Sequence, residues 1–143
     1  MQDQQGTILS LQICEGHRKP MTLVESAEVV KGLGIQGDRH AIAESTRQIL
    51  LIEKETLDDL KLSPGQVKEN ITTREIRLMK LELGQRIQVG ETAVLEVTKA
   101  CTPCGRMDEI RDGLKEQLAG RRGILARAIQ GGVIKIGDSI KVL

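Results

Sequence analysis

The 143-residue sequence contains no Phe, Tyr or Trp, so its apolar core must be built from Ile, Leu and Val. Proteins that bind single-stranded nucleic acid commonly stack the bases on aromatic rings, and this chain offers none of those three side chains. The formal net charge of +1 adds no strong attraction to nucleic acid or to a membrane surface. We therefore expect neither of them as a partner.

Long apolar runs are also missing. The longest uninterrupted aliphatic run is Ile49–Ile52, whereas a membrane-spanning helix needs roughly 20 apolar residues. The polar N-terminal stretch MQDQQGT leads into an apolar segment that is too short for a signal peptide. These features predict a cytoplasmic protein, and the length predicts one domain over residues 1–143 that folds without a disulfide or a metal.

Cysteine is scarce, and the three cysteines of the chain cannot all pair with one another. A reducing cytosol favours free thiols or thiolate ligands. Two of the cysteines lie in Cys101-Thr102-Pro103-Cys104, between a predicted strand and a predicted helix. The helix N-terminus and Arg106 favour a thiolate at Cys104, whereas Asp108 and Glu109 oppose it, so the direction of the pKa shift stays open.

The Cys-x-x-Cys spacing alone is compatible with several structures. Both cysteines could be small core residues, since buried unreactive cysteine is common. A thioredoxin-like redox pair requires a βαβ arrangement, which the sequence pattern does not show. A structural zinc site is a third alternative, because it would combine the thiolate and imidazole ligands that zinc binds. Its ligands would be Cys14, His17, Cys101 and Cys104.

Short apolar segments predict strands along most of the chain. A helix is predicted over residues 53–62, and a longer helix after Cys104 would carry one apolar stripe. This pattern is typical of a mainly-β fold, a closed or nearly closed β-barrel with a few peripheral helices. The predicted strands cover residues 7–14, 48–52, 67–72, 123–129 and 133–142, with a hairpin around Gly90-Glu91, and the stripe consists of Met107, Ile110, Leu114 and Leu118.

Three polar segments offer groups that could bind a ligand. In Gly37-Asp38-Arg39-His40, the guanidinium could hold a phosphate or carboxylate at two points, and the imidazole could exchange protons near neutral pH. Glu69, Asn70, Thr72 and Thr73 add hydrogen-bonding groups beside apolar strand positions, and Arg121-Arg122 could supply further anion contacts. An exposed turn, solvated strand residues and a solvated pair of arginines would have the same sequences.

Taken together and in this order, four segments resemble the MOSC domain family, which is named after the C-terminal domain of molybdenum-cofactor sulfurase. The Gly-Asp-Arg-His, Pro-Gly-x-x-x-Glu-Asn and x-Pro-Cys elements carry most of the resemblance. The segments are GIQGDRHA at 34–41, RQILLIEKETL at 47–57, SPGQVKENITT at 63–73 and LGQRIQVGETAVLEVTKACTPCGRM at 83–107.

The resemblance implies a β-barrel of the MOSC type and a cysteine that carries sulfur as a persulfide or binds the molybdenum of the molybdenum cofactor. The family cysteine follows a proline, which identifies Cys104 as the catalytic and metal-binding residue and leaves Cys101 as an additional thiol. The resemblance also implies a molybdopterin site around the phosphate and polar edges of the pterin. Its candidate residues are Arg39, His40, Arg47, Asn70, Thr72 and Arg122.

Our leading hypothesis is a molybdenum-cofactor binding or sulfur-carrier domain that acts through Cys104 and exchanges sulfur with a cysteine desulfurase or a molybdoenzyme. One alternative is a molybdenum-dependent reductase of N-hydroxylated compounds, and another is a zinc-stabilised interaction module. Relatives that act as reductases or sulfurases usually carry additional domains, which this sequence does not contain. That difference favours the binding or carrier role.

Overall fold

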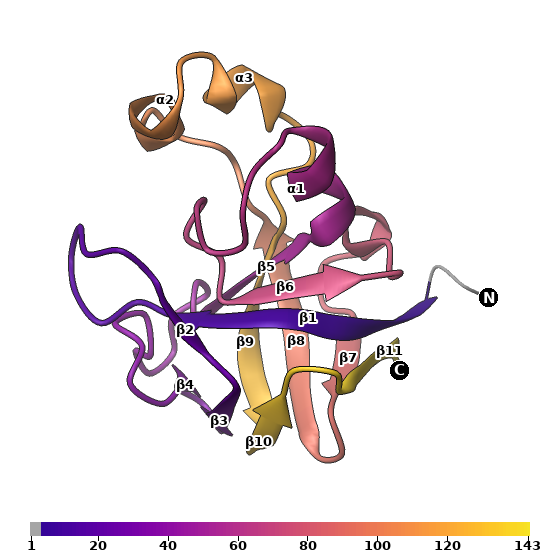
Figure 1. The fold of residues 1–143 in the computed structure, drawn as a ribbon. Helices are drawn as coiled ribbons and strands as arrows, with labels where there is room; N and C mark the ends of the chain where they lie inside the picture. The colour runs from indigo at the N-terminus through magenta and orange to yellow at the C-terminus, as the bar shows by residue number, and fades with distance from the viewer. Residues whose placement is uncertain (1–3) are drawn as a thin grey trace.

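Seven strands close into a barrel because the first strand pairs with the last (Figure 1). The computed structural model describes residues 4–143, so the first three residues of the polar N-terminal stretch lie outside the described part. Around the barrel, each strand pairs with the next in the order β1, β11, β7, β8, β9, β5, β6 and back to β1. The strands are β1 (Gln5–Ile13), β5 (Ile49–Glu53), β6 (Ile71–Arg74), β7 (Arg86–Val89), β8 (Ala93–Ala100), β9 (Ile124–Gln130) and β11 (Ser139–Val142). The predicted β-barrel is therefore confirmed.

One neighbouring pair in the barrel is parallel, and this pair needs a crossover. β5 and β6 run in the same direction, with Leu51 opposite Ile71, whereas the other pairs are antiparallel. The helix α1 (Lys54–Asp59) supplies part of the connection that parallel strands require. The strand predicted over residues 67–72 begins only at Ile71, because Gly65 and Lys68 hold a turn with positive φ angles of 86° and 72°.

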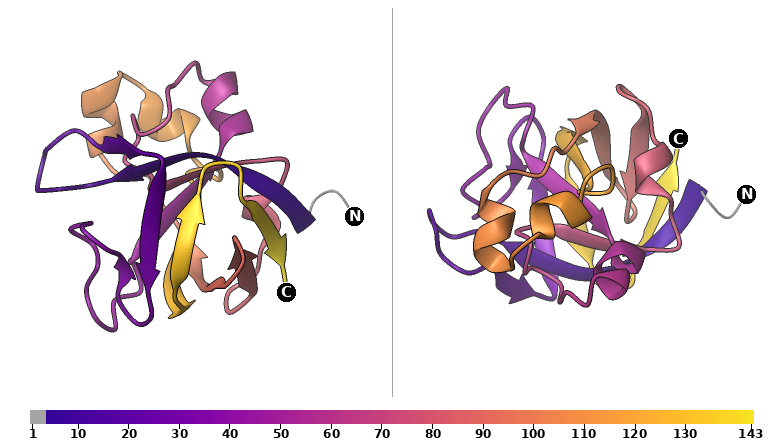
Figure 2. Two further views of the ribbon diagram at one scale, coloured as in Figure 1. Left: turned by 60° about the horizontal axis from the view of Figure 1, so that its bottom comes forward. Right: turned by 90° about the horizontal axis from the view of Figure 1, so that it is seen from above.

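A smaller sheet lies at the opposite side of the molecule from the helices (Figures 1 and 2). It consists of β10 (Gly132–Lys135), β3 (Ser26–Val30) and β4 (Gly34–Ile35), while β2 (Thr22–Val24) extends the barrel sheet beside β1. The single strand predicted over residues 133–142 was wrong. Gly137, at φ 93°, and Asp138, whose carboxylate accepts a hydrogen bond from the Lys135 N–H at 2.9 Å, form a turn that sends β10 and β11 into different sheets.

The residues of β5 face the barrel interior on one side and two separate clusters on the other. Ile49 and Leu51 belong to the cluster inside the barrel, whereas Ile52 packs outside it with Leu57 of α1, and Leu50 packs outside it with Cys101 and Leu125. Side chains alternate between the two faces of a strand. A strand buried on both faces therefore explains the continuous run of apolar residues in this segment.

The segment after Cys104 forms two short helices, α2 (Arg106–Ile110) and α3 (Leu114–Gln117), instead of the single long helix predicted. Gly113 has a φ of 82°, which ends the helical geometry between them. Three residues of the predicted apolar stripe are nevertheless buried in the cluster that contains Ile52 outside the barrel, namely Met107, Leu114 and Leu118, and the fourth, Ile110, is partly buried against it. Within residues 4–143, no helix is long and apolar enough to cross a membrane.

Candidate functional site

A cavity of about 430 Å³ lies against the outer face of β5 and β9. Leu50 and Leu125, which are directly opposite each other in the two strands, line it together with Cys101. Met107 and Ile110 of α2 contribute further apolar surface. The cavity therefore combines an apolar base with walls formed by α2 and by the loops around the barrel.

Positive charge is concentrated at this cavity. Although the chain is nearly neutral, with a formal net charge of +1, the cavity has many basic side chains and a single acid, Glu109. A hollow lined by one sign of charge attracts ligands of the opposite sign. The arrangement thus favours an anionic ligand. The basic residues are Arg18, Lys19, Arg39, Arg47, Lys68, Arg106 and Arg122.

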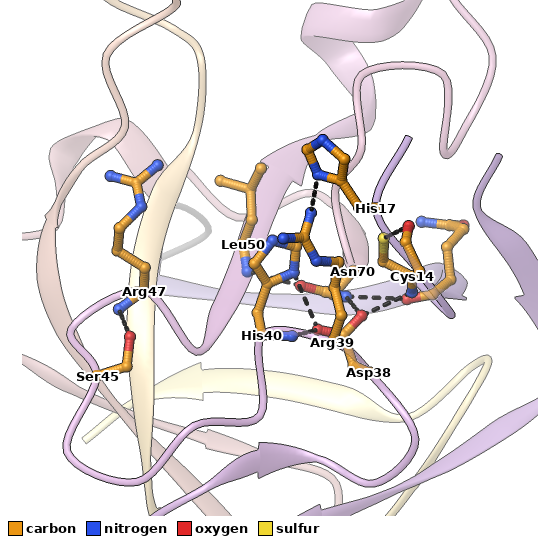
Figure 3. Close-up of polar contacts among 11 residues, drawn as sticks. Cys14, His17, Asp38, Arg39, His40, Ser45, Arg47, Leu50 and Asn70 are labelled. Carbon is orange, nitrogen blue, oxygen red and sulfur yellow. Dashed lines mark hydrogen bonds and ion pairs between the residues drawn. The ribbon is translucent and has the colours of Figure 1, made fainter. Parts of the chain in front are cut away.

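Asp38 anchors the loop that carries Arg39 and His40 (Figure 3). Its buried carboxylate accepts hydrogen bonds from the Cys14 N–H at 2.6 Å, from the Asn70 amide at 3.0 Å and from the His40 N–H at 2.9 Å. Burial by itself would raise the pKa of Asp38, but hydrogen bonds from His40 and from the Cys14 N–H hold it below its ordinary value. Asp38 is therefore an ionised anchor.

His40 and Arg39 project from this anchored loop to the cavity. The His40 ring contacts Asp38 through Nδ1 at 3.2 Å. When Nδ1 is the protonated nitrogen, Nε2 is left as a hydrogen-bond acceptor. Arg39 donates from Nη1 to Nδ1 of His17 at 3.2 Å, which requires a neutral His17 ring. Desolvation, followed by the charges of Arg39, Arg106 and Arg18, lowers the pKa of His17 and favours that neutral form.

Asn70 lines the cavity, but most of its hydrogen-bonding capacity is used within the protein. Its Oδ1 accepts a hydrogen bond from the Leu50 N–H at 3.0 Å, and its Nδ2 donates to Asp38 at 3.0 Å and to the Gln12 carbonyl at 3.2 Å. The residue therefore ties β5, β1 and the Asp38 loop together. In Figure 3, Leu50 lies between Arg47 on one side and this loop on the other.

Thr72 differs from the other candidate site residues, because it does not line the cavity. Its buried hydroxyl donates to Glu69 Oε2 at 2.8 Å and accepts from Gln12 Nε2 at 3.3 Å. Glu69 Oε2 also accepts from the Gly65 N–H at 2.9 Å, while its Oε1 is buried without a hydrogen-bond partner. Burial raises the pKa of Glu69 against the effect of these bonds. Thr72 is thus part of a buried polar network.

Arg122 is the buried cation of the cavity. Its side chain donates from Nη2 to the Val67 carbonyl at 2.6 Å, whereas Nη1 is buried without a partner. Burial lowers the pKa of Arg122, and the nearby Cys101, Glu69 and Cys104 act in the opposite direction. An unpaired buried donor on a charged group carries an energetic cost that a bound acceptor would remove.

Three cysteines line the same cavity in different settings. Cys104 is exposed, whereas Cys14 and Cys101 are buried. The helix after Cys104 has only five residues, so the helix dipole expected to act on this thiol is small. The Cys14 thiol contacts the Gly16 carbonyl oxygen at 3.3 Å.

The zinc alternative receives no support from the arrangement of these residues. Within residues 4–143, no group of three or more His, Cys, Asp or Glu side chains is placed to hold a metal ion. His17 instead accepts a hydrogen bond from Arg39. Cys101 is buried and packs with Leu50 and Leu125, which agrees with the small-core-residue alternative for this cysteine, whereas Cys104 is exposed and does not agree with it.

The site residues predicted from the sequence did not include Arg18, Lys19 or Lys68. The structure brings all three to the cavity, and Arg18 and Lys68 do so with positive φ angles of 60° and 72°. The run His17-Arg18-Lys19, in the loop that follows the first strand, was a usable signal, since loops beside a strand end often carry binding residues. No comparable signal marked Asp38 as the anchor, because its partners come from three different segments.

Comparison with known proteins identifies the fold and the family. The YuaD protein of Bacillus subtilis has a similar structure, with a TM-score of 0.83 and 19% identity over 96% of this chain and 95% of that one. YiiM of Geobacillus stearothermophilus gives a TM-score of 0.77 with 19% identity, covering 96% of this chain and 75% of its own.

YiiM of Escherichia coli gives a TM-score of 0.71 with 18% identity, over 97% of this chain and 69% of its own. No curated protein matches the sequence. The sequence profile of the MOSC domain matches residues 38–141, which is most of the chain. The chain therefore belongs to the MOSC domain family, which is associated with molybdenum-cofactor binding and sulfurase-related function.

Proposed function

We propose that this chain binds the molybdenum cofactor in the cavity and that the Cys104 thiol there either ligates molybdenum or carries a sulfane sulfur. The observation that carries the proposal is the combination of an exposed thiol with a cluster of basic side chains in one cavity. Thiolate is a soft ligand that suits such a metal, and guanidinium groups match phosphate at two points. The cavity also lies within the volume range of small-molecule sites, about 300–1,000 Å³.

The unpaired Nη1 of Arg122 supports the fit of an anionic cofactor. A phosphate oxygen at this position would accept the hydrogen bond that Nη1 lacks within the protein. The Arg47 guanidinium forms no hydrogen bond to another residue of the described chain and is available for the same group. The apolar base formed by Leu50 and Leu125 suits the flat face of a ring system.

The other candidate residues divide into direct and indirect roles. Arg39, Arg47 and Arg122 would hold the phosphate, and His40 would offer Nε2 to a polar edge. Asn70 and Thr72 would act indirectly, since their hydrogen bonds hold neighbouring segments in place. When bound, the cofactor would supply molybdenum as the centre for sulfur or redox chemistry.

The remaining parts of the proposal concern the setting of the domain. Residues 1–143 would act as a single domain in the cytoplasm. The exposed Cys104 thiol would be reached by a cysteine desulfurase that donates sulfur or by a molybdoenzyme that accepts it. An exposed thiolate can exchange sulfur with a partner, which a buried one cannot do without a conformational change.

Reconstitution with purified molybdenum cofactor tests the proposal. We expect the wild-type protein to retain molybdenum and pterin after gel filtration, and mass spectrometry to show either a persulfide or a metal-protected thiol at Cys104. Cys104→Ser should lose the thiol-dependent signal, and R122Q should weaken cofactor retention. R77Q, which changes an exposed arginine away from the cavity, is the matched control.

Full cofactor retention and full persulfide loading in Cys104→Ser would overturn the proposal. Addition of an electron donor to the loaded protein separates carrier from catalyst. Turnover of an N-hydroxylated compound would assign the same site to a reductase, and the absence of turnover in a demonstrably loaded protein would support the carrier role.

A further inference from the structure

The proposed function uses Cys104 and leaves Cys101 without a role. Cys101 lines the same cavity, three positions earlier in the chain, in a segment that belongs to no helix or strand. Its backbone N–H donates to the Gly123 carbonyl at 2.8 Å, which holds it beside Arg122. Its Sγ has only a long contact, 3.9 Å, to the Thr102 carbonyl oxygen. No strong hydrogen bond therefore ties up this thiol.

The two cysteines of the segment share one cation. Cys101 and Cys104 line the same cavity as Arg122, and either sulfur, when deprotonated, would raise the pKa of the Arg122 guanidinium, Cys101 more than Cys104. The Nη1 group of Arg122 is buried and has no protein partner. Arg122 is therefore placed to stabilise negative charge on either sulfur atom, or on an anion released between them.

The cysteines also differ in accessibility. Cys104 is exposed and can receive sulfur from a partner, whereas Cys101 is buried and about 7% exposed at the base of the cavity. Attack by a thiolate on a sulfur–sulfur bond requires two sulfur atoms that can come together, and the Cys-x-x-Cys spacing is one that forms disulfides. A buried Cys101 thiol in the same cavity as an exposed Cys104 thiol could therefore react with Cys104 after Cys104 has received its sulfur.

We infer that Cys101 is a resolving thiol that unloads the Cys104 persulfide and releases its outer sulfur as hydrosulfide inside the cavity. This inference rests on the sulfur-carrier form of the proposed function. The Cys101 thiolate attacks Sγ of the Cys104 persulfide, a Cys101–Cys104 disulfide forms, and the bond to the outer sulfur breaks. The outer sulfur leaves as HS⁻ with the electron pair of that bond and the persulfide proton.

The electrons of this step balance within the protein. The sulfane sulfur is reduced by two electrons to the oxidation state of sulfide, and the two cysteine sulfurs are oxidised to a disulfide. A dithiol reductant then restores both thiols by exchange and becomes a disulfide itself. The domain would thus convert bound sulfane sulfur into sulfide at the position where an anionic ligand is held.

Sulfide release from persulfide-loaded protein tests this inference. The protein is treated with inorganic polysulfide and desalted, its load is measured by intact mass spectrometry, and free sulfide is followed without reductant. We expect the wild type to release about one equivalent of sulfide per loaded Cys104 and to end as an intramolecular disulfide. Cys101→Ser should keep its persulfide, with release slowed by at least about tenfold.

Two further variants make the result specific. R77Q is the matched control for the arginine variant, because it changes an exposed arginine away from the cavity, and it should release sulfide as the wild type does. R122Q should load Cys104 but release sulfide more slowly, since the cation beside both thiols is gone. An external monothiol should restore release from loaded Cys101→Ser, which shows that the retained persulfide is reactive.

The outcomes separate this inference from the function on which it rests. Sulfide release from loaded Cys101→Ser at the wild-type rate, with no Cys101–Cys104 disulfide in the wild type, would overturn the resolving role and leave the carrier role intact. If Cys104 takes up no persulfide in the wild type, the sulfur-carrier function itself is wrong. Far-UV circular dichroism establishes that each variant is folded.

Discussion

At the scale of single residues, Asp38 controls the position of the basic loop. D38A would leave the Cys14 N–H, the Asn70 amide and the His40 N–H without their acceptor. We expect the free energy of unfolding to fall by about 2–4 kcal/mol, because unpaired buried donors are costly. Urea denaturation followed by far-UV circular dichroism measures this change, since the chain has no Trp or Tyr for fluorescence.

The pH dependence of stability gives a second readout for Asp38. Because the pKa of Asp38 in the folded protein is below its ordinary value, the ionised carboxylate stabilises the fold above about pH 4. This stabilisation is lost as the pH falls through the folded pKa. The acid limb of the stability profile should therefore be flatter in D38A than in the wild type. D112A, at an exposed position, is the control and should stay within about 0.5 kcal/mol of the wild type.

The contribution of Glu69 to stability should depend on pH in the opposite direction. Its folded pKa is raised by burial, so its contribution to stability is largest below about pH 4 and is lost as the pH rises through the folded pKa. E69Q cannot ionise. The stability of E69Q relative to the wild type should therefore increase between about pH 4 and pH 8 in paired denaturation experiments. A difference that does not change with pH would contradict an ionisable, buried Glu69.

At the scale of structural elements, Gly123 connects Arg122 to β9. It has a φ of 107°, and a Cβ at this position would collide with the Leu51 carbonyl oxygen of β5. G123A should therefore lower the free energy of unfolding by more than about 2 kcal/mol, from backbone strain and steric overlap together. G84A is the matched control, because Gly84 also has a positive φ, 85°, but open space around it. Equal destabilisation by the two variants would show that the close approach to Leu51 has no effect.

At the scale of the whole molecule, charge is distributed unevenly. The chain is nearly neutral, yet the cavity combines many cations with one acid, Glu109, which pairs with Arg18 at 3.2 Å across the cavity. Both side chains of this pair are 60% exposed, so the pair contributes only about 0–1 kcal/mol and is weakened by salt. Its main effect is to occupy Arg18 and to reduce the positive field.

Removal of this acid should strengthen anion binding. We expect E109Q to bind inorganic phosphate about two- to fivefold more tightly than the wild type at low ionic strength, with a smaller difference at high salt. E116Q removes an acid from α3 outside the cavity and should have little effect. An NMR titration of the two variants measures this, and equal affinities would show that Glu109 does not oppose anions.

The sequence predicted the elements whose pattern is local. The strands around residues 7–14 and 48–52, the hairpin at Gly90-Glu91 and the helix after Glu53 are present because side-chain alternation and turn residues act over a few positions. The sequence did not predict that residues 133–142 form two strands, or that the segment after Cys104 forms two helices. Each depends on one glycine with positive φ, which the pattern of neighbouring residues does not reveal.

The composition and the motifs by themselves determined an aliphatic core, a mainly-β fold, the family and Cys104 as the reactive candidate. Only the tertiary structure decided which cations line the cavity, that Asn70 clamps three segments while Thr72 lies outside the cavity, and that Cys101 lies beside Arg122. The physical reason is barrel closure. It places Gln5 opposite Lys141 and brings Arg18 against Glu109, and local sequence patterns carry no information about contacts between such distant segments.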